Sequence, residues 1–469
     1  MSMSIGIGTT LAYLAAASLF IFGIRTLRSP MTARAGNLIA AVGMLVAFVA
    51  TLLEFTAETT TLLLIAGVVA AGSAVGALTA IRVPMTSMPQ FVAAFNGVGG
   101  GAAALISFSE LYKLSPVLPS QNFVILLAIL FGILIGGVSF AGSAVAFTKL
   151  EEIAFEGSVT FPLQKVVNAL MFLVAVAAGV NVLIGGPMPV ASAAVVLGVS
   201  LLLGVLLVIP IGGADMPIVI SLLNAFTGLA AAASGFSLGN TVLIIAGALV
   251  GASGTILTYL MSAALGRSLS KILFGAVAAA GQEEAEEHDK PVTSGDPEDI
   301  GSMLANEADS VIFIPGYGLA VAQAQTAMAE LMRTLEQQGK EVKFAIHPVA
   351  GRMPGHMNVL LAEAKVPADK LVDLEDINDE FDDTDAVLIV GANDVVNPSA
   401  REDGDSPIAG MPILNADHAR RVVFVKRSLS PGFAGVDNPL FYDQERTTML
   451  FSDAKEGLEG VTEAVKNQG

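Results

Sequence analysis

Long apolar runs in the first 271 residues constrain this chain more than any other feature of its sequence. Each run is close to the 17–25 residues that a helix needs to cross ~30 Å of hydrocarbon. The runs lie near residues 5–24, 37–55, 61–81, 91–109, 122–147, 166–185, 189–210, 216–234 and 240–264. They predict a polytopic, all-α membrane domain of about nine transmembrane helices over residues 1–271. The first run lacks a basic leader and a convincing cleavage site, so we expect a retained span rather than a removed signal peptide.

Basic residues in the loops between these runs are distributed unevenly. If the loop that holds Arg25 and Arg28 is cytoplasmic, eight of the nine basic residues in 1–271 lie inside and only Lys113 lies outside. Cytoplasmic loops of membrane proteins carry such an excess of Lys and Arg. We therefore expect the amino terminus outside and everything after residue 271 in the cytoplasm.

The rest of the chain has a different charge balance. Residues 1–271 hold 9 basic and 7 acidic residues, whereas residues 272–469 hold 15 and 35, a net charge of −20. This balance excludes a basic nucleic-acid binder, and the absence of cysteine excludes a disulfide scaffold. The segment 281–297 is acidic and almost free of large apolar residues, so we expect a flexible acidic linker over 272–305.

Residues 306–469 alternate between strand and helix patterns. Apolar runs predict strands at 310–315, 342–346, 386–390 and 422–426, a shorter strand near 412–414, and a helix over 319–338. This alternation predicts a C-terminal α/β Rossmann-like doubly wound domain on a mostly parallel sheet.

A glycine-rich turn at residues 316–321 (Gly-Tyr-Gly-Leu-Ala-Val) stands between the first predicted strand and helix. Glycines at this point of a dinucleotide-binding fold allow a tight turn and let a pyrophosphate approach the helix amino terminus. The pattern alone is weakly specific, but its place between a strand and a helix favours nucleotide binding.

The residues after the later strands favour NADP(H) over NAD(H). An NAD-selective fold usually has an acid after its second strand, yet here His347 begins a segment that reaches Arg352 without one. Lys426, Arg427 and Ser428 end another strand and suit a 2′-phosphate. The alternative, solvated surface cations, is less favoured where basic residues are scarce. We expect no metal.

Polar side chains at membrane depth are costly unless they find a partner or water. Asn96, Asn168 and Asn224 lie in the fourth, sixth and eighth runs, and Asp215 lies just before the eighth. Interhelical hydrogen bonds for the asparagines and a helix cap for Asp215 are the structural alternatives to a role in ion movement. A helix cap is likewise the alternative for Asp394, which follows a predicted strand.

Six motifs together resemble the beta subunit of the proton-translocating nicotinamide nucleotide transhydrogenase family. They occupy residues 211–217, 315–325, 346–367, 391–394, 406–412 and 426–428. The motifs recur in order, and the resemblance covers essentially the whole chain.

This resemblance implies a Re/Si-specific enzyme of the prokaryotic plasma (inner) membrane. Hydride would pass between NADH on a partner alpha subunit and NADP⁺ on this chain, coupled to proton passage, in a dimer of alpha–beta units surrounded by lipid. Asp394 and Asp215 would take part in conformational switching, and residues 432–435 would form a lid. The implied NADP(H)-binding residues are Gly316, Tyr317, Gly318, Val321, Val349, Ala350, Gly351, Arg352, Asn393, Asp394, Lys426, Arg427, Ser428, Gly432, Phe433 and Ala434.

One departure from the family concerns the proton pathway. Some members have a titratable His in the fourth span, where this chain has Asn96, and its four histidines all lie beyond residue 271. We therefore predict that the alpha chain supplies the ionisable group, while Asn96 and Asn224 hold water in the pathway.

Two other functions compete with a transhydrogenase. The chain has a single dinucleotide fingerprint, so NAD(H) must sit on another subunit if two nicotinamides are to meet. A nucleotide-gated transporter or channel is the rival function. An electron-transfer module is a weaker one, because a chain without cysteine lacks the usual ligands of iron–sulfur clusters.

Overall fold

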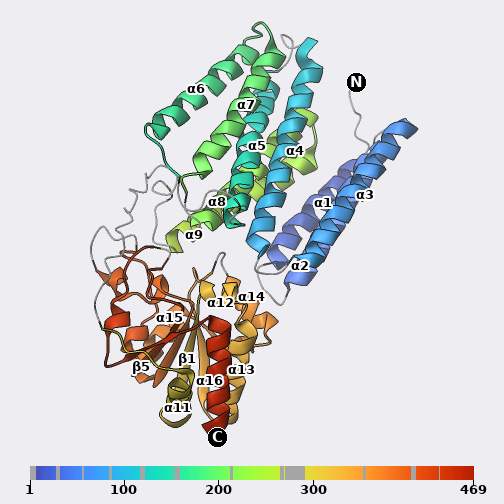
Figure 1. Ribbon diagram of the computed structural model, residues 1–469. Helices are drawn as coiled ribbons and strands as arrows, with labels where there is room; N and C mark the ends of the chain where they lie inside the picture. Colours follow the sequence, from blue (N-terminus) through green and yellow to red (C-terminus); the bar gives the residue numbers. More distant parts are fainter. Residues whose placement is uncertain are drawn as a thin grey trace. The chain divides into compact units, whose positions relative to one another are not determined.

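The chain divides into two compact units in the computed structural model (Figure 1). The first comprises residues 1–212 and 218–259, and the second comprises residues 213–217 and 260–469. The structure describes residues 7–27, 32–54, 58–83, 87–116, 122–151, 153, 159–211, 215–264, 269, 291–351, 355–402, 408–432 and 434–468.

Long apolar helices make up the first unit. Among the described residues, nine helices are long and apolar enough to cross a membrane, which confirms the prediction of about nine spans. They are α1 (Ile7–Thr26), α2 (Ala33–Glu54), α3 (Thr59–Arg82), α4 (Met88–Leu114), α5 (Phe123–Leu150), α6 (Gln164–Leu183), α7 (Pro189–Val208), α8 (Met216–Leu238) and α9 (Thr241–Ala264).

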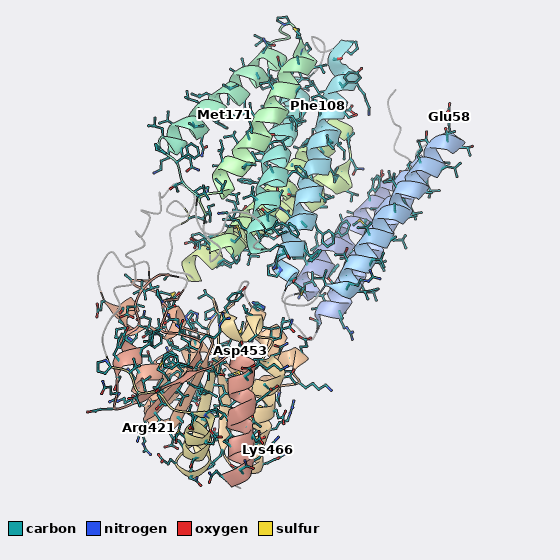
Figure 2. All side chains as sticks on the ribbon, in the orientation of Figure 1. Glu58, Phe108, Met171, Arg421, Asp453 and Lys466 are labelled. Atoms are coloured by element: carbon teal, nitrogen blue, oxygen red, sulfur yellow. The ribbon has the colours of Figure 1, made fainter. Side chains whose placement is uncertain are left out.

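Glycines bring α4 and α5 into backbone contact. A Cβ added to Gly136 of α5 would lie 2.7 Å from the Gly100 carbonyl oxygen and 2.9 Å from the Ala104 nitrogen, both on α4. Small residues at such positions let membrane helices approach closely, since no hydrophobic effect drives helices together in lipid. The many exposed Leu, Val and Phe side chains on the outer faces of these helices suit contact with lipid (Figure 2).

Six parallel strands form the sheet of the second unit, in the order β3-β2-β1-β4-β5-β6. They are β1 (Ser310–Pro315), β2 (Glu341–Ile346), β3 (Leu371–Asp373), β4 (Ala386–Val390), β5 (Arg421–Lys426) and β6 (Thr447–Phe451). The chain runs outward from β1 to β3 on one side and from β4 to β6 on the other. The carboxyl ends of β1 and β4 therefore flank the point where strand order reverses, which is where open α/β sheets bind ligands.

Helices cover one face of this sheet, and short turns cover the other (Figure 1). On the first face lie α11 (Pro297–Asn306), α12 (Tyr317–Val321), α13 (Gln325–Gln337), α14 (His356–Glu363) and α16 (Ala454–Gln468). The short helix α15 (Leu374–Ile377) and several 3₁₀ turns pack on the second face. Each face has a pair of edge-to-face phenylalanines, Phe313 with Phe344 and Phe424 with Phe441. The predicted α/β doubly wound architecture is thus confirmed.

Several element boundaries differ from those expected. β3 and β6 were not expected, because β3 has only three residues and β6 begins with two threonines. Residues 412–414 are not a strand, since the Leu414 amide bonds to the Val395 carbonyl outside any ladder. The helix expected over 319–338 is broken into α12 and α13, with Gln323 between them at φ +51°.

The expected linker over 272–305 is too long at its carboxyl end. Helix α11 lies within it, packs against α16, and buries Ile300 and Leu304 in the core. Met303 and Leu304 follow Ile300 by three and four residues, so the three side chains share one face of a helix. The acidic residues around them make this apolar pattern hard to recognise in the sequence. Residues 272–290 lie outside the part of the chain that the structure describes.

Replacing Gly136 by alanine tests the contact between α4 and α5. We expect Gly136→Ala to lower the free energy of unfolding of the detergent-solubilised chain by about 1–3 kcal/mol. The added methyl group would meet backbone atoms that have little freedom to move. Gly198→Ala on α7 is the matched control, since no atom lies within 4 Å of its added Cβ. Equal melting temperatures for the two variants would contradict this view of the packing.

Candidate functional site

Two backbone turns cross at the carboxyl ends of β1 and β4. Pro315 and Val390 are register partners, so Gly316 and Gly391 leave the sheet side by side. The Gly318 amide donates to the Gly391 carbonyl at 2.9 Å, and Gly391 adopts φ +66°. A Cβ on Gly316 or Gly391 would overlap the opposite backbone. Only glycines permit this approach, which brings the start of α12 against the turn after β4.

Asn393 lies two residues beyond this crossing and is only 9% exposed. Its side-chain oxygen accepts a hydrogen bond from Nδ2 of Asn438 at 3.0 Å. Its own Nδ2 is buried and has no partner among the described residues. A buried donor of this kind costs stability unless a ligand or water accepts its proton. Asn393 therefore fits a site that receives a polar molecule.

Asp394 joins the turn after β4 to the predicted lid segment. Its Oδ2 accepts a hydrogen bond from the Ala434 amide at 2.9 Å, and a Cβ on Gly432 would overlap its carboxylate. Ala434 also packs against the small apolar cluster that contains Ile408 and Ile413. The carboxylate thus lies against Gly432 and holds the Ala434 amide close to the end of β4.

Lys426 ends β5 beside the same carboxylate. Its ammonium donates to the Ser430 carbonyl at 2.7 Å and stands 4.6 Å above the Phe441 ring. Burial lowers the pKa of Lys426 to about 8, although the carboxylates of Asp394 and Asp437 act in the opposite direction. Arg427 and Ser428 are exposed next to it. Two cations and a hydroxyl therefore gather at the end of β5.

A neutral histidine shapes the loop after β2. Nδ1 of His347 accepts from the Val349 amide at 3.2 Å, so Nε2 must donate to the Pro412 carbonyl, 2.7 Å away. Both ring nitrogens are thus assigned, which leaves no place for a second proton. Burial lowers the pKa of His347 to about 4. The ring ties residues 349–351 to the segment around Pro412.

Most of the predicted binding residues lie on the carboxyl side of the sheet. Gly316, Gly318, Asn393, Asp394 and Lys426 follow three neighbouring strands, and Tyr317 and Val321 lie in α12. Val349, Ala350 and Gly351 follow β2. Arg352 and Phe433 lie outside the described residues. Sequence reasoning missed Asn438 and Phe441, because neither has a motif around it and both act only through residues distant in sequence.

A second group of polar residues lies among α4, α5 and α8. Nδ2 of Asn96 donates to Ser143 at 2.9 Å and to Ser139 at 3.3 Å. The Ser139 hydroxyl lies 2.6 Å from that of Thr227 and 2.8 Å from the Leu223 carbonyl. The Asn96 side-chain oxygen has no partner among the described residues. Farther along α4, Ser107 contacts Ser234 of α8 at 3.1 Å.

These contacts settle the alternatives only in part. Asn96 does form interhelical hydrogen bonds, as the structural alternative expected, yet one of its polar atoms remains available to water. Asn224 is half-buried on α8, and Asp215 is buried directly before that helix. Ser139 and Ser143 were not expected, although their four-residue spacing places both on one face of α5. Among the described residues, no group of three or more acidic or histidine side chains is arranged to hold a metal.

Together these features define a Rossmann-like doubly wound α/β domain that follows a unit of helices long and apolar enough to cross a membrane. The family model described as NAD(P) transhydrogenase beta subunit matches residues 9–464. The NAD(P) transhydrogenase subunit beta of Rhodospirillum rubrum is 44% identical over 467 residues, covering 97% of this chain and 99% of the relative, and the sequence from the strain ATCC 11170 gives the same values. The chain belongs to the NAD(P) transhydrogenase beta subunit family.

The pKa of His347 predicts a pH dependence of local stability. Because the folded-state pKa is depressed below the usual 6.5, the stabilisation is present above pH 6.5 and is lost as the pH falls towards 4. We expect residues 345–351 to lose roughly 2 kcal/mol of protection between pH 7 and 5, at ~1.4 kcal/mol per pKa unit. Native-state hydrogen exchange of the wild type and of His347→Gln measures this loss. Parallel pH profiles for the two proteins would refute it.

Proposed function

We propose that this chain binds NADP(H) at the carboxyl edge of its sheet and exchanges hydride with NAD(H) held by an alpha subunit, coupled to proton passage across the plasma (inner) membrane of a prokaryote. The observation that carries the proposal is the crossing of the turns at Gly316 and Gly391 beside the cations that end β5. Membership of the beta subunit family supports a transhydrogenase and an alpha partner.

The residues at this edge suit NADP(H) in their chemistry. The amino terminus of α12 favours a pyrophosphate, because the positive end of a helix attracts negative charge and the glycines let a phosphate approach the backbone. Lys426, Arg427 and Ser428 suit the 2′-phosphate that distinguishes NADP(H) from NAD(H). Nδ2 of Asn393 offers a buried donor to a polar group of the ligand. Arg352, which matches a nucleotide-contacting residue of the family, completes the proposed set.

Positioning is sufficient for the chemistry. NADP⁺ supplies the hydride acceptor, and direct transfer between two nicotinamides at ~3–3.5 Å needs neither an acid nor a base. The task of this chain is therefore to orient one dinucleotide and exclude water. Asp394 holds the Ala434 amide, and release of this hydrogen bond would free the proposed lid to open and close over the ligand.

Coupling requires that proton movement and nucleotide affinity influence each other to the same degree. We assign this link to Asp394 and to Asp215 at the start of α8. In the membrane, the polar contacts of α4 extend from Asn96 to Ser107, or about 16 Å along the helix axis at 1.5 Å per residue. Water held by the Asn96 oxygen and by Asn224 would continue this path to an ionisable group on the alpha subunit.

A reconstitution assay tests the proposal as a whole. The chain is inserted into vesicles with its alpha subunit, and reduction of an NADP⁺ analogue by NADH is followed together with internal pH. We expect hydride transfer and proton uptake only when both subunits are present. Absence of hydride transfer in every mixture would favour a nucleotide-gated transporter instead.

Titration of Lys426 predicts how NADP(H) affinity changes at alkaline pH. Its pKa of about 8 means that the ammonium loses its proton in the ligand-free protein as the pH rises through this value. We expect NADPH affinity to fall about tenfold between pH 7.5 and 9.5, since a bound phosphate favours the charged form. The NADPH affinity of Lys426→Arg should change little over the same pH range, because a guanidinium stays protonated. Calorimetric titration checks this, and an equal decline in both proteins would contradict it.

The proposed proton pathway predicts how proton pumping responds when the ionisable group is moved from the alpha subunit to position 96 of this chain. Removal of the intramembrane ionisable group of the alpha subunit should stop proton pumping, and adding Asn96→His should restore part of it. Asn168→His on α6 is the matched control, because Asn168 lies on another helix and is not among the hydrogen-bond partners of Asn96 in the described residues. If neither the deletion nor Asn96→His alters pumping, the alpha subunit does not supply the relay group.

A further inference from the structure

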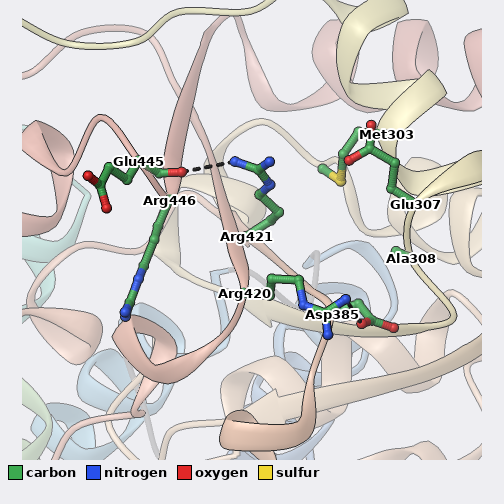
Figure 3. Close-up of a pocket in the computed structure, with 8 residues that line it drawn as sticks. All are labelled: Met303, Glu307, Ala308, Asp385, Arg420, Arg421, Glu445 and Arg446. Atoms are coloured by element: carbon green, nitrogen blue, oxygen red, sulfur yellow. Dashed lines mark hydrogen bonds and ion pairs between the residues drawn. The ribbon is translucent and has the colours of Figure 1, made fainter.

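The cavity at the amino-terminal edge of the sheet has a lining of balanced charge. It encloses about 380 Å³, and its charged residues are three arginines and three acids: Arg420, Arg421, Arg446, Glu307, Asp385 and Glu445 (Figure 3). The guanidinium groups of Arg421 and Arg446 point in different directions. A buried polar atom without a partner is a more specific sign of a bound molecule, because burial leaves it no bulk water to bond with. Such an atom lies in the first unit.

Gln90 lies in the first turn of α4 and is only 5% exposed. Its Nε2 donates to the carbonyl of Leu150, the last residue of α5, at 3.3 Å. Because a carbonyl can only accept, this contact fixes which end of the Gln90 amide carries the oxygen. Oε1 therefore cannot share the contact with Leu150 and needs a donor of its own.

The side-chain oxygen of Gln90 is buried and has no partner among the described residues. The side-chain oxygen of Asn96, six residues farther along α4, also lacks one. At 1.5 Å per residue, the two positions are about 9 Å apart along the helix axis. Between them, Ala93 of α4 and Ala146 of α5 are fully buried and carry only a methyl group. Two buried acceptors on one helix thus need small donors, which is the usual role of buried water.

The last turn of α5 joins this position to the connection before α8. The Lys149 ammonium donates to the carbonyls of Ile209 and Ile211, which lie just after α7. A helix end leaves such carbonyls without intrahelical partners and favours a cation beside them. Ile211 begins the motif that contains Asp215, the residue to which we assign coupling. Gln90 and Lys149 thus tie α5 to α4 and to the chain that leads to Asp215.

We propose that Gln90 binds a water molecule through Oε1, and that this water extends the proton pathway from Asn96 to the end where α4 begins. The water would donate one hydrogen to Oε1, accept a proton on its oxygen and release its other hydrogen to the next water. The amide itself neither gains nor loses a proton. The role in the pathway rests on the proposed function, whereas the hydration of Gln90 does not.

Cryo-electron microscopy of the chain with its alpha subunit in lipid nanodiscs, at a resolution that shows ordered water, tests the hydration directly. We expect a water about 2.5–3.0 Å from Oε1 of Gln90, the usual distance of an O–H···O hydrogen bond. This water should be absent from Gln90→Met, whose side chain has a similar length but no oxygen. Gln164→Met is the matched control. Gln164 begins α6 and donates to the Leu206 carbonyl at 3.0 Å, but its oxygen is not a buried atom without a partner.

Proton uptake by vesicles that contain both subunits tests the role in the pathway. We expect Gln90→Met to slow uptake about fivefold or more, equivalent to ~1 kcal/mol for one lost hydrogen bond, while NADPH affinity stays unchanged. Gln164→Met should match the wild type in both measurements. Equal slowing by the two variants would overturn the inference, and so would absence of the water from the wild type, even if Gln90→Met does not fold. A wild type that holds this water but transfers no hydride would confirm the site and contradict the proposed function.

Discussion

The crossing of two glycine turns at the ends of β1 and β4 is the constraint on which the rest of the second unit depends. Because Pro315 and Val390 are in register, Gly316 and Gly391 leave the sheet at the same level, where any Cβ would collide with the opposite backbone. This approach places Asn393 and Asp394 at the strand-order reversal. Asp394 in turn holds the Ala434 amide, so the position of the proposed lid follows from the crossing.

The two units satisfy their polar groups in different ways. In the second unit, burial shifts the pKa of particular groups: it lowers the pKa of His347 to about 4 and that of Lys426 to about 8. In the first unit, the polar contacts among the described parts of α4, α5 and α8 join neutral amides and hydroxyls, such as Asn96, Ser139 and Thr227. Such groups can order water but cannot take up a proton near neutral pH, which is why a relay group on another chain is required by the proposed mechanism.

Residue patterns predicted the architecture well and the local geometry less well. The nine spans and four of the six strands followed from runs of apolar residues, whose burial does not depend on distant contacts. β6 could not be recognised, because Thr447 and Thr448 acquire their strand conformation only by pairing with β5. The residues that the motifs marked as candidates, such as Gly316 and Asp394, lie at the carboxyl ends of neighbouring strands, and their role stays a prediction. Asn438, Phe441 and Ser139 were not predicted, since each contacts a residue 15 or more positions away in the sequence.

The stoichiometry and selectivity of nucleotide binding to the purified full chain test the central claim most directly. Equilibrium dialysis with NADPH and NADH, without the alpha subunit, measures both at once. The account predicts one NADPH per chain, a far weaker affinity for NADH, and loss of NADPH binding in Gly316→Ala, because the added methyl group would collide with the turn at Gly391. Equal affinity for the two nucleotides, or unchanged NADPH binding in Gly316→Ala, would contradict it.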